Sequence, residues 1–376
     1  MQVGARHPRA AVEAARGSGS STARGPILVV APSWVGDAIL SEPLIARLAA
    51  TGDANEGHPA IDVLAPAWCA PVYARMRGIR RIFDSMLRHG EIGLGRRREL
   101  GRTLAGESYA RAIILPNSWK SALAPWLAGI PLRTGYTGEA RFGIVNDRRP
   151  LDRDATPRLV DRYAALAMPD TTALAASAPV LIPDSANRDA AVGSLGLSVD
   201  RGISILCPGA EFGPAKRWPA EHFAKLARRF LADGLEVWML GSPNDKAAAA
   251  AVLDSVGDAR DSIRDLSGRT DLGTAIDLLS LATVVVSNDS GLMHAAAAVR
   301  APLIALFGSS SPGYTPPISA TARVARIDIA CSPCFRRECP LGHFRCMREL
   351  APDSVYDLAR SSLPSRGNAA SPRPDP

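Results

Sequence analysis

The chain has 376 residues, of which 47% are hydrophobic and 22% charged, a composition typical of soluble globular proteins. Its length exceeds one ordinary hydrophobic core and suits two domains of about 150 to 180 residues. No apolar run approaches the roughly 20 residues that cross a bilayer, and residues 1–25 lack the apolar segment of a secretory signal.

Strands and helices are expected to alternate from residue 27 onward, which predicts parallel sheets with helices on both faces. The pattern breaks between Met168 and Ser198, which is rich in Ala, Pro and Asp and has no clear period. The expected strands are Ile27–Val30, Ile61–Leu64, Arg80–Phe83, Ala112–Leu115, Arg133–Gly135, Ile203–Cys207, Glu236–Leu240, Thr283–Ser287, Leu303–Phe307 and Arg323–Ile327. The expected helices are Ala38–Ala50, Trp68–Met76, Gly95–Leu104, Lys120–Leu127, Leu159–Leu166, Ala220–Ala232, Pro243–Ser255, Leu272–Leu281, Leu292–Val299 and Asp353–Ser361.

Two similar halves around this break predict two facing Rossmann-like, doubly wound α/β domains with a ligand cleft between them. We place the N-terminal domain at residues 26–180 and the C-terminal domain at 199–350, followed by a helix within 351–363. The ends of the chain, 1–25 and 364–376, are expected to be disordered.

The first strand leads through a Pro/Ser/Gly loop to Asp37, without the G-x-G-x-x-G spacing of a dinucleotide fingerprint. Asp37 falls at the start of the following helix. It serves there either as a helix cap, worth about 1 kcal/mol, or as a carboxylate at the mouth of a cleft, where a general base is needed.

The same organisation returns in the second half, where the strand Ile203–Cys207 leads through a Gly/Pro loop to Lys216 and Arg217. This basic pair stands just before a helix and can bind a diphosphate by charge, although such pairs are often simply solvated.

A third strand–loop–helix unit centres on Asp289, between an apolar run and an alanine run. Its small polar residues suit a helix N-cap. Free backbone N–H groups and the positive end of the helix dipole at such a turn suit a phosphate. Asp289 is then placed to reach a ribose or to cap the helix, and His294 either faces the same crevice or is a structural histidine.

Five segments of the chain together resemble the type II ADP-heptose:lipopolysaccharide heptosyltransferases of glycosyltransferase family 9. The resemblance covers about residues 26–360, and its motifs are long, ordered and specific. The segments that carry it are Pro32–Asp37, Leu64–Cys69, Leu115–Ala122, Pro208–Pro219 and Asn288–His294.

The resemblance implies the GT-B fold, with ADP-heptose as donor and an inverting displacement that requires no cofactor for catalysis. Enzymes of GT-A type usually recruit a divalent metal through an Asp-x-Asp motif, and no such motif stands at an expected strand end here. The last helix commonly packs back onto the N-terminal domain in the GT-B fold. The resemblance places Asp37 as general base and Lys216 on the phosphates, with donor contacts at Gly36, Thr270, Asp289, Ser290, Gly291, Leu292 and His294.

The acceptor implied by the resemblance is a heptosylated Kdo–lipid A, a phosphorylated molecule that calls for cationic side chains on the N-terminal domain. The arginine run at 96–98 is equally well read as a solvated helix face. Our candidates for acceptor binding are Arg96, Arg97, Arg98, Lys120, Arg133 and Arg141.

The cysteines divide into two groups. Cys69 and Cys207 are isolated in apolar contexts and are expected to be small buried hydrophobes. The other four form the pattern C-x2-C-x4-C-x6-C, with His343 before the last of them. Four clustered thiolates suit a structural zinc ion, but an iron–sulfur cluster uses the same ligands and reduced thiols without metal are a third reading. The four are Cys331, Cys334, Cys339 and Cys346.

The net charge of +7 points to an anionic partner. No aromatic-interleaved basic motif or helix-turn-helix pattern indicates nucleic acid. An anionic membrane surface fits better, since each basic residue near it contributes about 1 kcal/mol; a generally basic surface is the plain alternative.

The sequence therefore predicts a cytoplasmic enzyme, peripheral to the inner membrane of a Gram-negative bacterium, that adds heptose to the first heptose of the lipopolysaccharide core. A type I or III heptosyltransferase with a different acceptor, a sugar-nucleotide epimerase of similar architecture and a non-enzymatic nucleotide-binding module are the alternatives.

Overall fold

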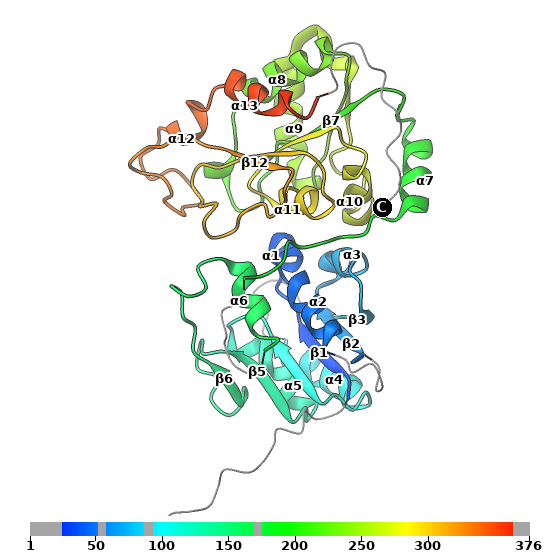
Figure 1. Ribbon diagram of the computed structural model, residues 1–376, viewed down its shortest axis with the longest axis vertical. Helices are drawn as coiled ribbons and strands as arrows, with labels where there is room; N and C mark the ends of the chain where they lie inside the picture. Colours follow the sequence, from blue (N-terminus) through cyan, green and yellow to red (C-terminus); the bar gives the residue numbers. More distant parts are fainter. Residues whose placement is uncertain (1–24, 52–57, 86–92, 169–174, 364–376) are drawn as a thin grey trace, which may run out of the picture.

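The computed structural model describes residues 25–51, 58–85, 93–168 and 175–363, and Figure 1 shows two α/β domains, one above the other. The disorder predicted for both ends of the chain falls on residues 1–24 and 364–376, which lie outside the described residues. No helix in the described ranges is long and apolar enough to cross a membrane.

The N-terminal domain is built on a six-stranded parallel sheet in the order β3-β2-β1-β4-β5-β6. The interior strand β2 is buried at every position, as expected for a strand covered on both faces. The edge strand β6 was not predicted because its sequence, Asp-Arg-Arg, has no apolar residue. The strands are β1 (Ile27–Val30), β2 (Ile61–Ala65), β3 (Ile79–Asp84), β4 (Arg111–Ile114), β5 (Leu132–Tyr136) and β6 (Asp147–Arg149).

The helices of this domain follow the expected pattern with one break. The single helix predicted for Ala38–Ala50 is two helices that meet at Ser41, because Pro43 has no N–H to continue the first one. The helices are α1 (Val35–Leu40), α2 (Glu42–Ala50), α3 (Ala70–Tyr73), α4 (Leu94–Ala105), α5 (Leu123–Leu127) and α6 (Leu159–Ala165), with 3-10 turns η1 (Ala67–Cys69) and η2 (Trp119–Ala122).

The C-terminal domain repeats this architecture with a parallel sheet in the order β12-β11-β10-β7-β8-β9. Numbered from its own first strand, each sheet has the strand order 3-2-1-4-5-6 of dinucleotide-binding domains. The two facing Rossmann-like domains are therefore confirmed. The strands are β7 (Ile203–Cys207), β8 (Glu236–Met239), β9 (Ile263–Asp265), β10 (Val284–Asn288), β11 (Leu303–Leu306) and β12 (Ala322–Ala325).

The helices around this second sheet include two that the sequence analysis missed, the single-turn helix α12 and the longer α7. Helix α7 lies in the supposed break and packs against α10; it was missed because Ala191 is its only buried residue. The helices are α7 (Ser185–Leu195), α8 (Ala220–Ala232), α9 (Lys246–Val256), α10 (Leu272–Leu279), α11 (Gly291–Ala298), α12 (Arg345–Arg348) and α13 (Pro352–Arg360), with 3-10 turns η3 (Pro214–Lys216), η4 (Pro243–Asp245) and η5 (Gly257–Ser262).

The last helix corrects one expectation. Helix α13 packs on α8, β11 and β12 of its own domain and not on the N-terminal domain (Figure 1). Val355 and Ala359 are buried in the C-terminal core, and the Tyr356 hydroxyl donates to Asp233 at 2.6 Å. The apolar face of this helix is thus covered by elements of the C-terminal domain.

The two domains meet through α1 and α11, whose ends face each other in Figure 1. A Cβ on Gly291 would lie 2.9 Å from the side chain of Val35, so the two helices touch where only glycine fits. The main cluster of buried apolar residues runs without interruption from one domain into the other. The relative position of the domains is therefore fixed by packing.

Candidate active site

Four of the predicted site residues follow the strands at the topological switch point of each sheet. Asp37 follows β1 and Lys120 follows β4, while Lys216 follows β7 and Asp289 follows β10. Ligands of open α/β sheets bind at this point, beyond the carboxyl ends of the strands. The fold thus brings the predicted base and the predicted phosphate ligands to the same interdomain cleft.

Asp289 is the centre of a polar network in the C-terminal domain. It is only 5% exposed, and its Oδ2 accepts hydrogen bonds from Lys216 Nζ and from the Ser310 hydroxyl, both at 2.5 Å. The adjacent Asn288 accepts from the backbone N–H of Trp218 and donates to the carbonyl of Pro208. Sequence reasoning placed both Lys216 and Asp289 on the donor; in this structure they also bind each other.

The Asp37 carboxyl lies in the first turn of α1, and Trp34, not Asp37, is the N-cap. Burial raises its pKa to about 6, the positive charge of Lys216 opposes that rise and the negative charge of Asp289 adds to it. The pKa of Asp37 is therefore influenced by the charges of both Lys216 and Asp289 across the cleft. A carboxylate with a pKa near 6 is mostly ionised at neutral pH and still basic enough to accept a proton.

His294 points toward the N-terminal domain from α11. A Cβ on Gly36 would lie 2.8 Å from its ring, so a larger side chain at this position would collide with the imidazole; the predicted donor contact of Gly36 stays a prediction. Burial lowers the pKa of His294 to about 4. The imidazole is therefore neutral at neutral pH and acts through packing or hydrogen bonding rather than charge.

The remaining predicted donor residues lie near the start of α11, apart from one. Ser290 is the N-cap and accepts from the backbone N–H of Met293, while Gly291 and Leu292 form the first turn. Their N–H groups are available to an anion. Thr270 lies elsewhere, in the loop between β9 and α10.

The N-terminal side of the cleft holds a cavity of ≈ 540 Å³. Asp37 lies in its wall together with two of the predicted acceptor residues, Arg97 and Lys120. Arg97 is 6% exposed, and its guanidinium donates to the carbonyl of Lys120. The volume of this cavity lies in the range of small-molecule binding sites, and its wall carries cationic side chains.

The other predicted acceptor residues are not in the wall of this cavity. Arg141 is 2% exposed and donates to the carbonyls of Pro116 and Tyr136, and Arg133 donates to the carbonyl of Ile144. Both guanidinium groups thus donate to main-chain carbonyls, with Arg141 buried and Arg133 partly exposed, and their predicted role in acceptor binding stays a prediction. The remaining two, Arg96 and Arg98, lie on the exposed face of α4.

Two residues that sequence reasoning missed lie in the cavity wall. Arg162, on α6, stacks its guanidinium over the ring of Tyr314 at 5.0 Å. Tyr314 belongs to the C-terminal domain, and its carbonyl accepts from the backbone N–H of Leu159 at 3.0 Å. A tyrosine in an irregular loop carries no local signal of such a contact, so only the tertiary structure reveals it.

The cysteine-rich segment lies against the loops of the C-terminal domain that carry Lys216 and Ser310. The pKa of the Cys346 thiol is raised by burial and by the charges of the three other thiols, which are therefore close by. Among the described residues, however, no three or more His, Cys, Asp or Glu side chains are arranged to hold a metal ion. The structural zinc site stays a prediction. Cys69 and Cys207 are buried, as expected.

A model of glycosyltransferase family 9 (heptosyltransferase) matches residues 97–345. The chain belongs to this family. It is therefore a glycosyltransferase, and the epimerase and the non-enzymatic module are set aside. The enzyme is 40% identical to lipopolysaccharide heptosyltransferase 2 of Salmonella typhimurium over 91% of this chain and 99% of that protein. It is 41% identical to lipopolysaccharide heptosyltransferase 2 of Escherichia coli over 90% and 98%.

Solved structures agree with the fold. The ADP-heptose lps heptosyltransferase II of E. coli superposes with a TM-score of 0.79 at 39% identity, covering 90% of this enzyme and 98% of that chain. The E. coli heptosyltransferase WaaC with ADP has a TM-score of 0.65 at 18% identity, covering 90% and 100%, and supports the fold alone. The enzyme has the GT-B architecture.

Proposed function

We propose that this enzyme transfers L-glycero-D-manno-heptose from ADP-heptose to the first heptose of the lipopolysaccharide inner core. The observation that carries the proposal is the likeness to type 2 heptosyltransferases through both domains. The cleft supplies the chemistry, because a buried carboxylate faces a lysine and a helix N-terminus across it.

In the proposed reaction Asp37 accepts the proton of the acceptor hydroxyl. The resulting oxygen nucleophile attacks the anomeric carbon of heptose from the side opposite the diphosphate, so the configuration inverts. The bond from that carbon to the diphosphate oxygen breaks, and ADP departs. Lys216 and the N–H groups that begin α11 stabilise the charge on the leaving group. No resident metal is needed, since these groups supply the positive charge.

The acceptor occupies the N-terminal cavity, where Arg97, Lys120 and Arg162 supply positive charge in or near the wall. Phosphate groups on a lipid-linked core are suitable partners for these cations. We further propose that the enzyme works at the cytoplasmic surface of the inner membrane, because its substrate is held there. The net charge of +7 favours an anionic leaflet.

The deciding experiment incubates the enzyme with ADP-heptose and two purified acceptors, a core that ends in one heptose and a core without heptose. Mass spectrometry should detect heptose added only to the first. A site that hydrogen-bonds the first heptose leaves polar groups unpaired when that sugar is absent, which discriminates by about 10⁴-fold. Comparable transfer to the heptose-free core would reassign the enzyme to type I activity, and no transfer to either would reject both.

A further inference from the structure

Asp289 receives its two side-chain hydrogen bonds from two different loops. Lys216 belongs to residues 208–218, which we call the lysine loop, and Ser310 belongs to residues 307–311, the serine loop. Both loops follow strands of the same sheet, and both donors converge on the same carboxylate oxygen. The position of Lys216 therefore depends on how the two loops are held relative to each other.

The cysteine segment, residues 331–346, is bound to the serine loop near one end. The Ser332 hydroxyl donates to the carbonyl of Gly308 at 2.7 Å, and the backbone N–H of Phe335 donates to the carbonyl of Ser309 at 2.7 Å. A Cβ on Gly308 would lie 2.4 Å from the sulfur of Met347, so α12, which begins within the end of the segment, also packs tightly against this loop.

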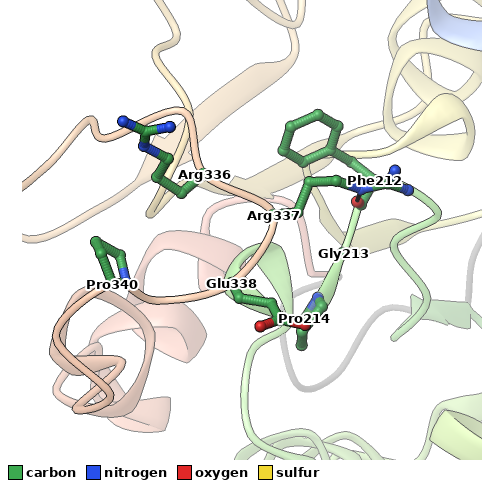
Figure 2. Close-up of a pocket in the computed structure, with 7 residues that line it drawn as sticks. All are labelled: Phe212, Gly213, Pro214, Arg336, Arg337, Glu338 and Pro340. Carbon is green, nitrogen blue, oxygen red and sulfur yellow. Dashed lines mark hydrogen bonds between the residues drawn. The ribbon is translucent and has the colours of Figure 1, made fainter.

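The same segment is bound to the lysine loop through Arg337. The Arg337 Nε donates to the carbonyl of Phe212 at 2.6 Å, and the Arg337 carbonyl accepts from the backbone N–H of Ala215 at 3.0 Å. A Cβ on Gly213 would lie 2.5 Å from that carbonyl oxygen. The lysine loop and the cysteine segment are thus in contact at a point where a residue larger than glycine would separate them. Figure 2 shows Arg337 directed at Phe212, while the side chain of Arg336 points away.

The ring of Phe212 links this contact to Lys216. Lys216 Nζ lies 5.0 Å from the ring centroid, and the guanidinium carbon of Arg337 lies 5.6 Å from it. Both cations fall within the distance at which an aromatic face attracts positive charge. Lys216 is therefore held by Asp289 on one side and by Phe212 on another, and Arg337 holds Phe212.

We propose that the cysteine segment is a clamp that joins the lysine and serine loops and sets Lys216 for the donor diphosphate, with Arg337 as its positioning residue. This inference rests on the proposed role of Lys216. Arg337 acts through Lys216 and the Phe212 ring and not by touching the heptose. The segment thereby has a function in this enzyme whether or not its thiols hold a metal.

The test is a double-mutant cycle on the full-length enzyme, with ADP affinity from calorimetry and kcat/KM for ADP-heptose as readouts. Arg337→Ala should weaken ADP binding and lower kcat/KM by about tenfold, as expected for coupled neighbours. In a Lys216→Ala background the same change should alter either value less than about twofold. Arg336→Ala, in the same segment, is the matched control and should behave as the unmodified enzyme.

Three outcomes overturn the clamp: Arg337→Ala without effect, effects that add fully to those of Lys216→Ala, or an equal effect of Arg336→Ala. If Lys216→Ala itself leaves ADP affinity and turnover unchanged, the proposed donor site fails instead. Gly213→Ala covers the case in which Arg337→Ala does not fold. It should give the same loss by pushing the loops apart, and its loss should likewise vanish without Lys216.

Discussion

Arg75 and Asp277 bind each other across the domain boundary. The guanidinium on the N-terminal side donates two hydrogen bonds, of 2.7 and 2.6 Å, to a carboxylate that is fully buried on α10. Asp277 also accepts from the backbone N–H of Asp184 and from the Asn187 amide, both near the start of α7. One buried carboxylate thus joins both domains and the connection between them.

We expect Arg75→Ala to lower the stability of the enzyme by about 3 kcal/mol, because it leaves a buried carboxylate without its cation. Thermal unfolding followed by circular dichroism measures the change. Arg77→Ala, an exposed arginine two residues away, is the control and should unfold with the unmodified enzyme. Equal midpoints for both variants would show that the ion pair adds nothing to the interface.

Replacing the base is expected to stop transfer without removing the donor. Asp37→Asn should reduce kcat by about 10² or more and leave ADP affinity close to that of the unmodified enzyme. Quenched-flow or endpoint assays with a heptose-terminated core measure the first value, and calorimetry measures the second. Near-normal turnover in the variant would remove Asp37 from the mechanism.

The pH dependence follows from the same residue. Because the pKa of Asp37 is raised to about 6, the carboxyl is protonated and inactive as a base below that pH. We expect kcat/KM to rise with pH through about 6 and to level off above it. A profile that is flat between pH 5 and pH 8, with chemistry limiting, contradicts this assignment.

Tyr314 should affect the acceptor and not the donor. Tyr314→Ala removes a ring that stacks on Arg162 in the wall of the N-terminal cavity. We expect the KM for the acceptor to rise by about tenfold, on the scale of one desolvated cation–π contact, with ADP affinity unchanged. Tyr314→Phe keeps the ring and should restore most of the loss. A rise confined to the KM for ADP-heptose would place Tyr314 on the donor side.

Glu42, a buried carboxyl outside the active site, should make the stability of the enzyme depend on pH. It is 8% exposed, and burial raises its pKa from the ordinary 4.5 to about 7, against a hydrogen bond from the Val180 N–H. The folded protein binds this proton more tightly than the unfolded chain does. The contribution of protonated Glu42 to the stability of the fold is therefore full below pH 4.5 and is lost as pH rises through about 7. The melting temperature of Glu42→Gln, relative to that of the unmodified enzyme at the same pH, should therefore rise as pH increases. Glu99→Gln, an exposed carboxyl on α4, should show no such trend.

We expect the four-cysteine cluster to bind one zinc ion per chain. Elemental analysis of protein purified without an affinity metal column decides it, with thiol titration before and after a chelator. A metal-free, fully active enzyme with four titratable thiols at these positions would favour the reading as reduced cysteines.

The sequence by itself determined the elements that carry a strong local signal. The strands Ile27–Val30 and Ile203–Cys207 and the helix Ala220–Ala232 were predicted to the residue, because apolar runs and a strong 3.6-residue period report burial directly. Motif spacing also placed Asp37, Lys216 and Asp289 at strand ends, and parallel sheets bring such ends to one edge.

The tertiary structure decided what local patterns do not encode. The sequence made Arg141 a candidate for acceptor binding, yet the folded loops surround its guanidinium with main-chain carbonyls that need donors. The last helix has an apolar face, but only packing shows that α8 and not the N-terminal domain covers it. Tyr314 and Arg162 meet from opposite domains. The sequence determines which side chains are apolar and favour burial and which are polar and need hydrogen-bond partners. Many chemically equivalent partners exist along the chain, and only its three-dimensional arrangement decides which of them lies within reach.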